Sequence, residues 1–278
     1  MSASQRGGMT GYFTDGSMLR QVVGEYAVAL SGPRALLMMA AHPVAFAGFF
    51  AHTGALEDPY ERLRRTGQVL DLIAWGESRE PADRATARVR AMHRRVRGET
   101  TEPAGRFPAG TPYRGDDPAL LLWILACMVD SATLVYEKYV RRMTAAERDA
   151  LWADYRVVGR LFGLSERDMP PDWASFRAYM TGMLRSGDLI VTDKARELAV
   201  EIVLHPPAPL LARPLVELVN QITVGLLPNS LRRQYGLRWD PVRRLALAGG
   251  AHYARHLLVP LAPSRLRLIP QARSADAR

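Results

Sequence analysis

Apolar residues recur along most of the chain at helical spacing, and turn and cap signals divide them into separate helices. Gly32 and Pro33 begin a helix that is predicted to run to Gly54, with a kink at Pro43. Alternating patterns typical of strands are hardly present between the helices. The pattern therefore predicts an all-α protein.

The next two helices are marked by the same kinds of signal. Asp58 and Pro59 supply an N-cap and a first-turn proline for a helix that is expected to end near Gly76. Pro81 starts another helix, which Gly98 is expected to end.

A loop rich in glycine and proline, residues 98–116, separates these helices from a long apolar helix that is predicted to begin at Asp117 and to end near Met143. We expect this loop to cover a pocket. Thr144 and Glu147 form a capping-box pattern for the following helix. More helices are predicted near residues 172–186, 193–204, 213–226 and 241–258.

The composition is that of one globular unit. With 278 residues, of which 48% are hydrophobic, the chain has enough apolar material for one large core. We predict a single helical domain over residues 1–262 and a flexible basic tail over residues 263–278. Cys127 is the one cysteine and lies in an apolar run, which excludes an internal disulfide and a cysteine-based zinc site.

The net charge of +9 is compatible with an anionic partner such as nucleic acid or a membrane surface. No helix-turn-helix or aromatic RNA-binding motif is recognisable, so we expect no nucleic acid partner. The first twenty residues lack the apolar run of a secretion signal, and no later segment has about 18 uninterrupted apolar residues. The sequence therefore predicts a cytoplasmic protein without a transmembrane segment.

The helix that ends at Gly98 carries one histidine between two arginines. Arg90, His93 and Arg97 are spaced i, i+3 and i+7, which places them along one face. Because two nearby cations penalise a third charge, His93 is expected to stay neutral and able to bind a metal. A haem needs such an imidazole as an axial ligand, and its propionates pair with arginines. The spacing permits this site, but by itself it favours a solvated basic helix.

The preceding helix carries a second polar cluster. Arg62, Arg65 and Thr66 lie at i, i+3 and i+4, and Val69 and Ile73 continue the same side of the helix. Taken alone, this pattern favours an amphipathic helix with its charged end in water.

These residues belong to a set of motifs through which the chain resembles the family of the fungal oxygenase MpaB and the bacterial rubber oxygenase, or latex clearing protein. The motifs, in the family's order, are GYFTDGSMLRQVVGE, GPRALLMMAAHPVAFAGFFAHT, DPYERLRRT, RVRAMHRRVRG, DDPALLLWILACMVDSATLVYE and GLLPNSLRRQYGLRW. Each motif alone is moderately specific, whereas six in order cover most of the chain. The resemblance implies a globin-like helical core that binds haem b.

The resemblance also implies roles for individual residues. His93 corresponds to the proximal iron ligand, with Arg90 and Arg97 as its supporting residues or as partners of the haem propionates. Arg62, Arg65 and Thr66 match the family's distal pattern, except that arginine replaces lysine at position 65. An arginine stays protonated and is not expected to coordinate iron, so Arg65 would instead donate hydrogen bonds toward oxygen or substrate.

Three further positions follow from the family motifs. His42 corresponds to the histidine of the HP motif and either acts on the distal side or satisfies backbone carbonyls freed by Pro43, two roles that stay open. Arg232 either reaches a propionate or is a surface charge. Ile124 follows Trp123 where the family often has a histidine, which predicts a more apolar wall.

If the resemblance holds, the chain is a haem b-dependent oxidoreductase that acts on an apolar small molecule with dioxygen or peroxide, by oxidative cleavage or oxidation of an unsaturated chain. The tunnel for such a molecule would be lined by Phe46, Phe49, Phe50, Leu122 and Trp123. Two alternatives are a haem-binding or gas-sensing protein without turnover and a helical lipid-binding protein that has lost the cofactor. The sequence does not determine the oligomeric state.

Overall fold

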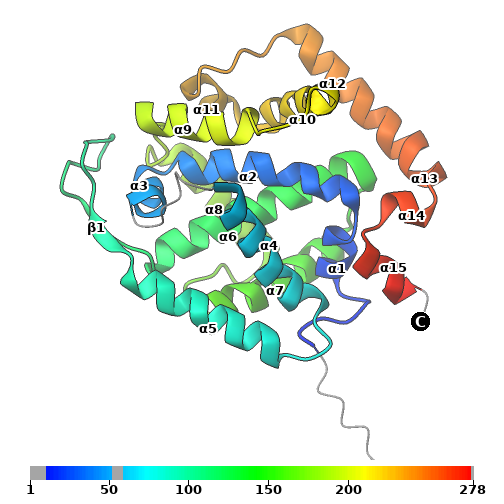
Figure 1. The fold of residues 1–278 in the computed structure, drawn as a ribbon, viewed down its shortest axis with the longest axis horizontal. Helices are drawn as coiled ribbons and strands as arrows, with labels where there is room; N and C mark the ends of the chain where they lie inside the picture. The colour runs from blue at the N-terminus through cyan, green and yellow to red at the C-terminus, as the bar shows by residue number, and fades with distance from the viewer. Residues whose placement is uncertain (1–10, 52–58, 277–278) are drawn as a thin grey trace, which may run out of the picture.

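The structure is a computed structural model that describes residues 11–51 and 59–276, with the side chains of residues 49–51 and 275–276 left out of the description. Helices dominate it (Figure 1). The first elements are α1 (Met18–Val23), the 3-10 helix η1 (Tyr26–Leu30), α2 (Ser31–Ala40), α3 (Pro43–Ala51), α4 (Pro59–Trp75) and α5 (Glu80–Arg95). The strands β1 (Arg97–Glu99) and β2 (Pro112–Arg114) follow.

The second half of the fold is again helical. It comprises α6 (Pro118–Val135), the π-helical turn η2 (Tyr136–Val140), α7 (Ala145–Phe162), α8 (Trp173–Arg185), α9 (Asp193–Leu204), η3 (Leu210–Ala212), α10 (Arg213–Leu226) and α11 (Asn229–Gln234). The chain then forms α12 (Pro241–Tyr253), the π-helical turn η4 (Ala254–Leu258), α13 (Val259–Leu261), α14 (Ser264–Arg267) and α15 (Pro270–Asp276). The predicted mostly helical fold is confirmed, whereas the one helix predicted from Gly32 to Gly54 is divided into α2 and α3 just before Pro43.

Local capping explains several helix boundaries. The Asp117 carboxylate accepts from the backbone N–H groups of Ala119 and Leu120 at the start of α6. Thr144 and Glu147 form the predicted capping box of α7. Gly163 ends α7 in the left-handed conformation, with φ of 109°. These signals lie within a few residues of the boundary, which is why the sequence predicts them well.

The loop predicted at residues 98–116 contains a short antiparallel hairpin that the sequence pattern does not predict. Arg97 pairs with Arg114 and Glu99 with Pro112. Three residues per strand are too few to show an alternating pattern. The hairpin packs against α3. The approach is close at Gly48, where an added Cβ would lie 3.3 Å from the Tyr113 ring.

The long apolar helix α6 is the centre of the fold. Trp123, Cys127 and Val129 are fully buried in it, and α2 packs along its length. In Figure 1, α9 and α10 lie on one side of α2, while α4, α5 and α7 lie on the other. Residues 118–140 form the one described helix whose length and apolar composition would suffice to cross a membrane, and 67% of its apolar window is buried inside the fold.

A buried ion pair joins α2 to α6. The Arg34 side chain is 4% exposed, and its Nη2 lies 2.8 Å from Asp130 Oδ2. Arg34 also donates to Ser131 Oγ at 2.6 Å and to the Leu226 carbonyl at 2.8 Å. The half-exposed Arg177 reaches the second carboxylate oxygen of Asp130 at 2.5 Å. These contacts explain two polar residues in an otherwise apolar helix.

The C-terminal stretch that the sequence analysis assigned to a flexible tail packs on the body of the protein. The Ile269 N–H donates to the Gly24 carbonyl at 2.9 Å, and Leu268 is buried. The Arg267 Nε lies 3.2 Å from Glu25 Oε1 in an ion pair with a buried carboxylate. Leu268 pairs with Glu25 in an isolated β-bridge, so the stretch gains backbone contacts that composition alone does not reveal.

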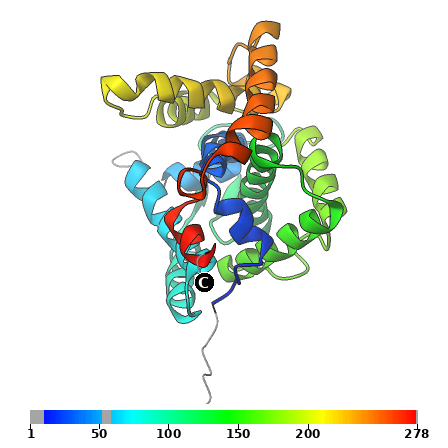
Figure 2. The same ribbon diagram turned by 90° about the vertical axis from the view of Figure 1, so that its right-hand side faces the viewer.

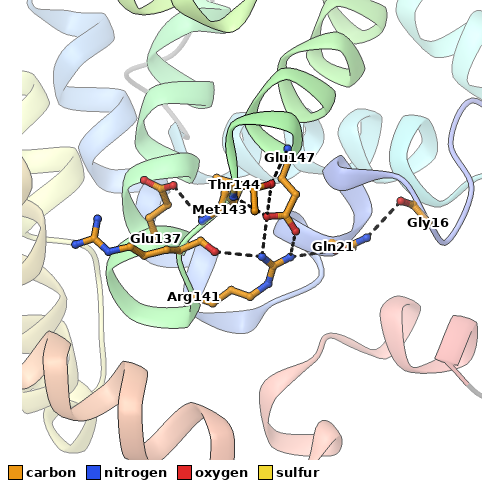
Figure 3. A network of polar contacts seen from close by, with 8 residues as sticks. Gly16, Gln21, Glu137, Arg141, Met143, Thr144 and Glu147 are labelled. Carbon is orange, nitrogen blue, oxygen red and sulfur yellow. Dashed lines mark hydrogen bonds and ion pairs between the residues drawn. The ribbon is translucent and has the colours of Figure 1, made fainter.

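A cavity of about 420 Å³ lies between α1, η2 and this C-terminal stretch. Its lining includes Arg20, Glu25, Tyr136 and Arg141. Figure 3 shows how Arg141 is held there, with its guanidinium on the Glu147 carboxylate at 2.8 and 3.1 Å. None of the residues that form this cavity is a predicted site residue.

Candidate functional site

His93 lies in the last turn of α5, where the helix meets the hairpin. Its carbonyl accepts from the Val96 N–H at 3.1 Å, which ends the helix. The hairpin returns to the same point, because the Gly115 N–H donates to the Val96 carbonyl at 2.8 Å. A Cβ at Gly115 would lie 2.8 Å from the His93 carbonyl oxygen. The backbone around His93 is therefore tightly enclosed.

The environment of His93 favours a neutral imidazole. Burial lowers the pKa of His93 below its ordinary value, and the positive charge of Arg62 lowers it further, whereas Asp116 opposes the shift. The imidazole Nδ1 is buried and has no hydrogen-bond partner among the described residues. A neutral ring with an unpartnered nitrogen is what a metal ligand requires.

Arg62 is the predicted site residue that the structure brings to His93. It is half-buried on α4, and burial lowers the pKa of its guanidinium to about 10. The predicted neutrality of His93 is thus supported, but the cause differs from the expected one. Burial and Arg62 contribute to the pKa shift, whereas Arg90 and Arg97 are not among its causes.

Arg65 and Thr66 lie on the exposed side of α4 in this structure. The Arg65 side chain is 73% exposed, and its Nε lies 2.8 Å from Glu61 Oε1. The Thr66 hydroxyl donates to the Arg62 carbonyl at 3.0 Å. The structure does not bring either side chain to His93, and their distal roles stay predictions.

The two arginines that flank His93 have different surroundings. The Arg90 guanidinium donates to the Leu161 carbonyl near the end of α7, where it ties α5 to that helix. Arg97 is exposed at the start of β1, and its Nε donates to the Arg94 carbonyl at 3.1 Å. The positive charge of Arg97 helps to lower the pKa of the Asp116 carboxyl, so Arg97 lies near Asp116.

His42 is buried at the start of α3 and serves the backbone there. Its Nδ1 accepts from the Ala45 N–H at 3.4 Å, and its ring lies 5.5 Å from the ring of Phe107. The group that His42 satisfies is thus a backbone N–H rather than a carbonyl freed by Pro43, and both of its predicted roles stay predictions. No described contact joins His42 to His93.

We expect His42 to make the protein less stable in mild acid. Burial lowers the pKa of His42, with smaller opposing contributions from Asp188 and Asp117 and a lowering one from Arg106. The unfolded chain therefore binds a proton more readily, and stability is lost as pH falls from about 6.5 toward the folded pKa, by up to about 1.4 kcal/mol per pH unit.

Denaturant unfolding of the wild type and His42→Gln between neutral pH and pH 5 measures this contribution. The free energy of unfolding should fall less steeply with falling pH in His42→Gln than in the wild type. His205→Gln, at an exposed histidine, is the matched control and should follow the wild type. Equal slopes for all three proteins would contradict the assignment.

Arg232 lies among the C-terminal helices. Its Nη1 donates to the Val224 carbonyl at 3.1 Å, its Nη2 donates to the Asn229 side chain, and its guanidinium lies 5.3 Å from the centre of the Trp239 ring. These neighbours belong to α10, α11 and the segment after them, and none is a neighbour of His93. A role for Arg232 toward a propionate stays a prediction.

An apolar cavity of about 50 Å³ lies beside α4. Its lining comes from α2, α3, α4, α6 and α9 and includes Leu36, Met39, Phe46, Leu63, Ile124 and Val203. Leu63 follows Arg62 directly in the chain, so one turn of α4 contributes to both the cavity and the surroundings of His93. The sequence did not single out Leu63, because it lies in a polar stretch.

Of the five residues predicted to line a tunnel, one borders the apolar cavity, and the tunnel itself stays a prediction. Phe46 lines the apolar cavity, and so does Ile124. Leu122 and Trp123 are buried in the core and do not line the cavity. The side chains of Phe49 and Phe50 lie outside the described residues.

The described residues contain no group of three or more His, Cys, Asp or Glu side chains that could hold a metal ion. A metal at His93 would therefore rely on one protein ligand, as the iron of a porphyrin does. The site and fold together define a mostly helical protein in which a half-buried histidine, His93, lies near a desolvated arginine, Arg62.

Comparison with known proteins identifies the family of this chain. The chain belongs to the family described as ER-bound oxygenase mpaB/B'/Rubber oxygenase, catalytic domain, which matches residues 20–256. Membership in a family of oxygenase catalytic domains implies that the chain is an enzyme of oxygenase type.

Two mycobacterial relatives are similar to this chain. It is 27% identical over 189 residues to the uncharacterized protein Mb2261 of Mycobacterium bovis, and equally to the uncharacterized protein Rv2237 of Mycobacterium tuberculosis. The match covers 67% of this chain and 69% of each relative. No solved structure matches the chain. The globin-like core therefore stays a prediction.

Proposed function

We propose that this chain is a haem b-dependent oxidoreductase in which His93 is the iron ligand. The observation that carries the proposal is the half-buried His93 imidazole, whose pKa is lowered and whose buried Nδ1 has no partner among the described residues. The residue lies in the helix whose motif resembles the family's proximal motif. Bound haem b would supply a redox-active iron at which dioxygen or peroxide reacts.

The surroundings of His93 suit a group that carries carboxylates. Arg62 places a desolvated positive charge beside the imidazole, and Arg97 adds an exposed one nearby. Guanidinium groups pair with carboxylates such as haem propionates in bidentate fashion. Of the predicted partners, Arg62 is the one whose charge acts on the His93 imidazole, whereas Arg90 donates to a carbonyl of α7.

The proposed substrate is an apolar small molecule, such as one with an unsaturated chain. The lining of the cavity beside α4 is apolar, which favours hydrocarbon and excludes water. The cavity is small, about 50 Å³, so it would receive one end of such a molecule. Ile124 in its wall supplies no proton donor, so proton transfer would depend on other groups.

The test of this proposal is the visible spectrum of the protein after haem is supplied. We expect a Soret band in the wild type and its loss or strong alteration in His93→Ala. His205→Ala replaces an exposed histidine on α9 and should keep the wild-type spectrum. Added imidazole should restore the band in His93→Gly, which would separate loss of a ligand from misfolding.

Absence of a Soret band in the wild type, or an identical band in His93→Ala, would sink the proposal. Turnover is tested separately by oxygen uptake. Uptake that needs both haem and an unsaturated hydrocarbon identifies an oxygenase, whereas haem binding without uptake identifies the alternative haem-binding or gas-sensing protein.

A further inference from the structure

Large hydrophobic side chains are exposed mainly in one part of the molecule. Eleven of the fourteen that are strongly exposed among the described residues lie between Leu210 and Leu266. Leu211 is 97% exposed, Leu261 79% and Leu245 75%. Leucines scattered singly over a surface are ordinary, but such a concentration marks an interaction surface.

Several of these side chains lie along one long helical segment. The elements α12, η4 and α13 follow one another without a break from Pro241 to Leu261. Within them, Val242, Leu245, Tyr253 and Leu257 are spaced so that they return to the same side of the helix. In Figure 2 the yellow α10 and the orange α12 form the outer end of the molecule, and α10 contacts α12. We call the exposed side of η3, α10 and α12–α14 the C-terminal face.

The positive charge of the protein is concentrated in the same region. Residues 205–275 contain ten arginines and two acidic residues, Glu217 and Asp240. This segment therefore carries a charge of +8 out of the net +9. The stretch from residue 241 to residue 275 contains six arginines and no acidic residue. Residues 1–204 are close to neutral by comparison.

We propose that the C-terminal face docks on the surface of an anionic phospholipid bilayer. Exposed leucines interleaved with arginines are typical of helices that lie in a membrane interface, with apolar side chains among the acyl chains and cations among the headgroups. A second copy of this chain is the poorer occupant, because the contact would bring two strongly basic surfaces together. Nucleic acid would use the arginines but leave the leucines exposed to water.

Vesicle sedimentation of the full chain tests this proposal. We expect the protein to sediment with vesicles that contain phosphatidylglycerol and at least about tenfold less with vesicles of phosphatidylcholine alone. Raised salt should release much of the bound protein, because it screens the arginines. This surface does not depend on haem, so the outcome is independent of the proposed function.

Two variants separate the apolar contribution from the charged one. Leu245→Glu with Leu261→Glu should weaken binding to anionic vesicles by at least about tenfold, since it removes inserted side chains and adds repulsion. Arg243→Gln with Arg265→Gln should weaken it roughly tenfold and reduce its salt dependence. Leu72→Glu changes an exposed leucine on α4 and serves as the matched control, with binding unchanged.

Vesicle binding that is unaffected by the leucine and arginine variants would overturn the proposal. A concentration-dependent dimer in sedimentation velocity, lost in the leucine variant and without vesicle binding, would assign the face to a second copy. A wild-type protein that is retained on a nucleic acid column but does not sediment with anionic vesicles would also overturn the membrane assignment.

Discussion

Asp130→Ala should lower the free energy of unfolding by about 3–5 kcal/mol, because it leaves the Arg34 guanidinium buried without its carboxylate. The Arg34 side chain is 4% exposed, so water cannot replace the lost partner. Urea unfolding followed by circular dichroism measures the loss. The half-exposed Arg177 contacts the same carboxylate, and Arg177→Ala is the control, with an expected loss under about 1 kcal/mol.

Removal of both buried charges should be less harmful than removal of one. Arg34→Met combined with Asp130→Leu replaces the pair by apolar side chains of similar size, and such replacements are often neutral. We therefore expect the double variant to be more stable than Asp130→Ala. If Asp130→Ala and Arg177→Ala lost equal stability, the buried pair would not be the important contact.

Gly115→Ala should lower the free energy of unfolding by about 1–3 kcal/mol and reduce the fraction of protein that binds haem at His93. The new Cβ would lie 2.8 Å from both the His93 carbonyl oxygen and the Val96 Cβ. A backbone carbonyl cannot rotate away as a flexible side chain can, so the end of α5 must shift. Thermal unfolding and the height of the Soret band after haem is supplied measure the two effects.

Gly182→Ala is the matched control for this substitution. Nothing lies within 4 Å of a Cβ at Gly182, which is in the last turn of α8. Alanine should therefore stabilise that helix by about 0.5–1 kcal/mol and leave the spectrum unchanged. A Gly115→Ala protein that is as stable and as well loaded as the control would show that the enclosure of His93 is not tight.

The helices were predictable because their signals are local. Pro43, Asp117 and the capping box at Thr144 each act within a single turn. The hairpin was not predictable, because its partners Arg97 and Arg114 are separated by a loop and each strand has only three residues. The docking of the C-terminal stretch depends on Gly24, which lies far away in the chain.

The candidate site shows the same division between local and distant information. The sequence identified His93 and Arg62, because both belong to motifs that can be compared with a family. It attributed the neutral imidazole to Arg90 and Arg97, whereas burial and Arg62 are what lower its pKa. Which helices face each other is determined by packing in the core. A single sequence indicates this packing only where its motifs resemble those of a known family.

Helix α4 carries Arg62 toward His93 and the adjacent Leu63 into the apolar cavity. A rigid helix cannot move one of these side chains without the other. Any movement of α4 that widens the cavity therefore also changes the position of a positive charge beside the imidazole. Binding of an apolar molecule and binding of a ligand at His93 are then thermodynamically linked, so that each changes the affinity for the other by the same factor.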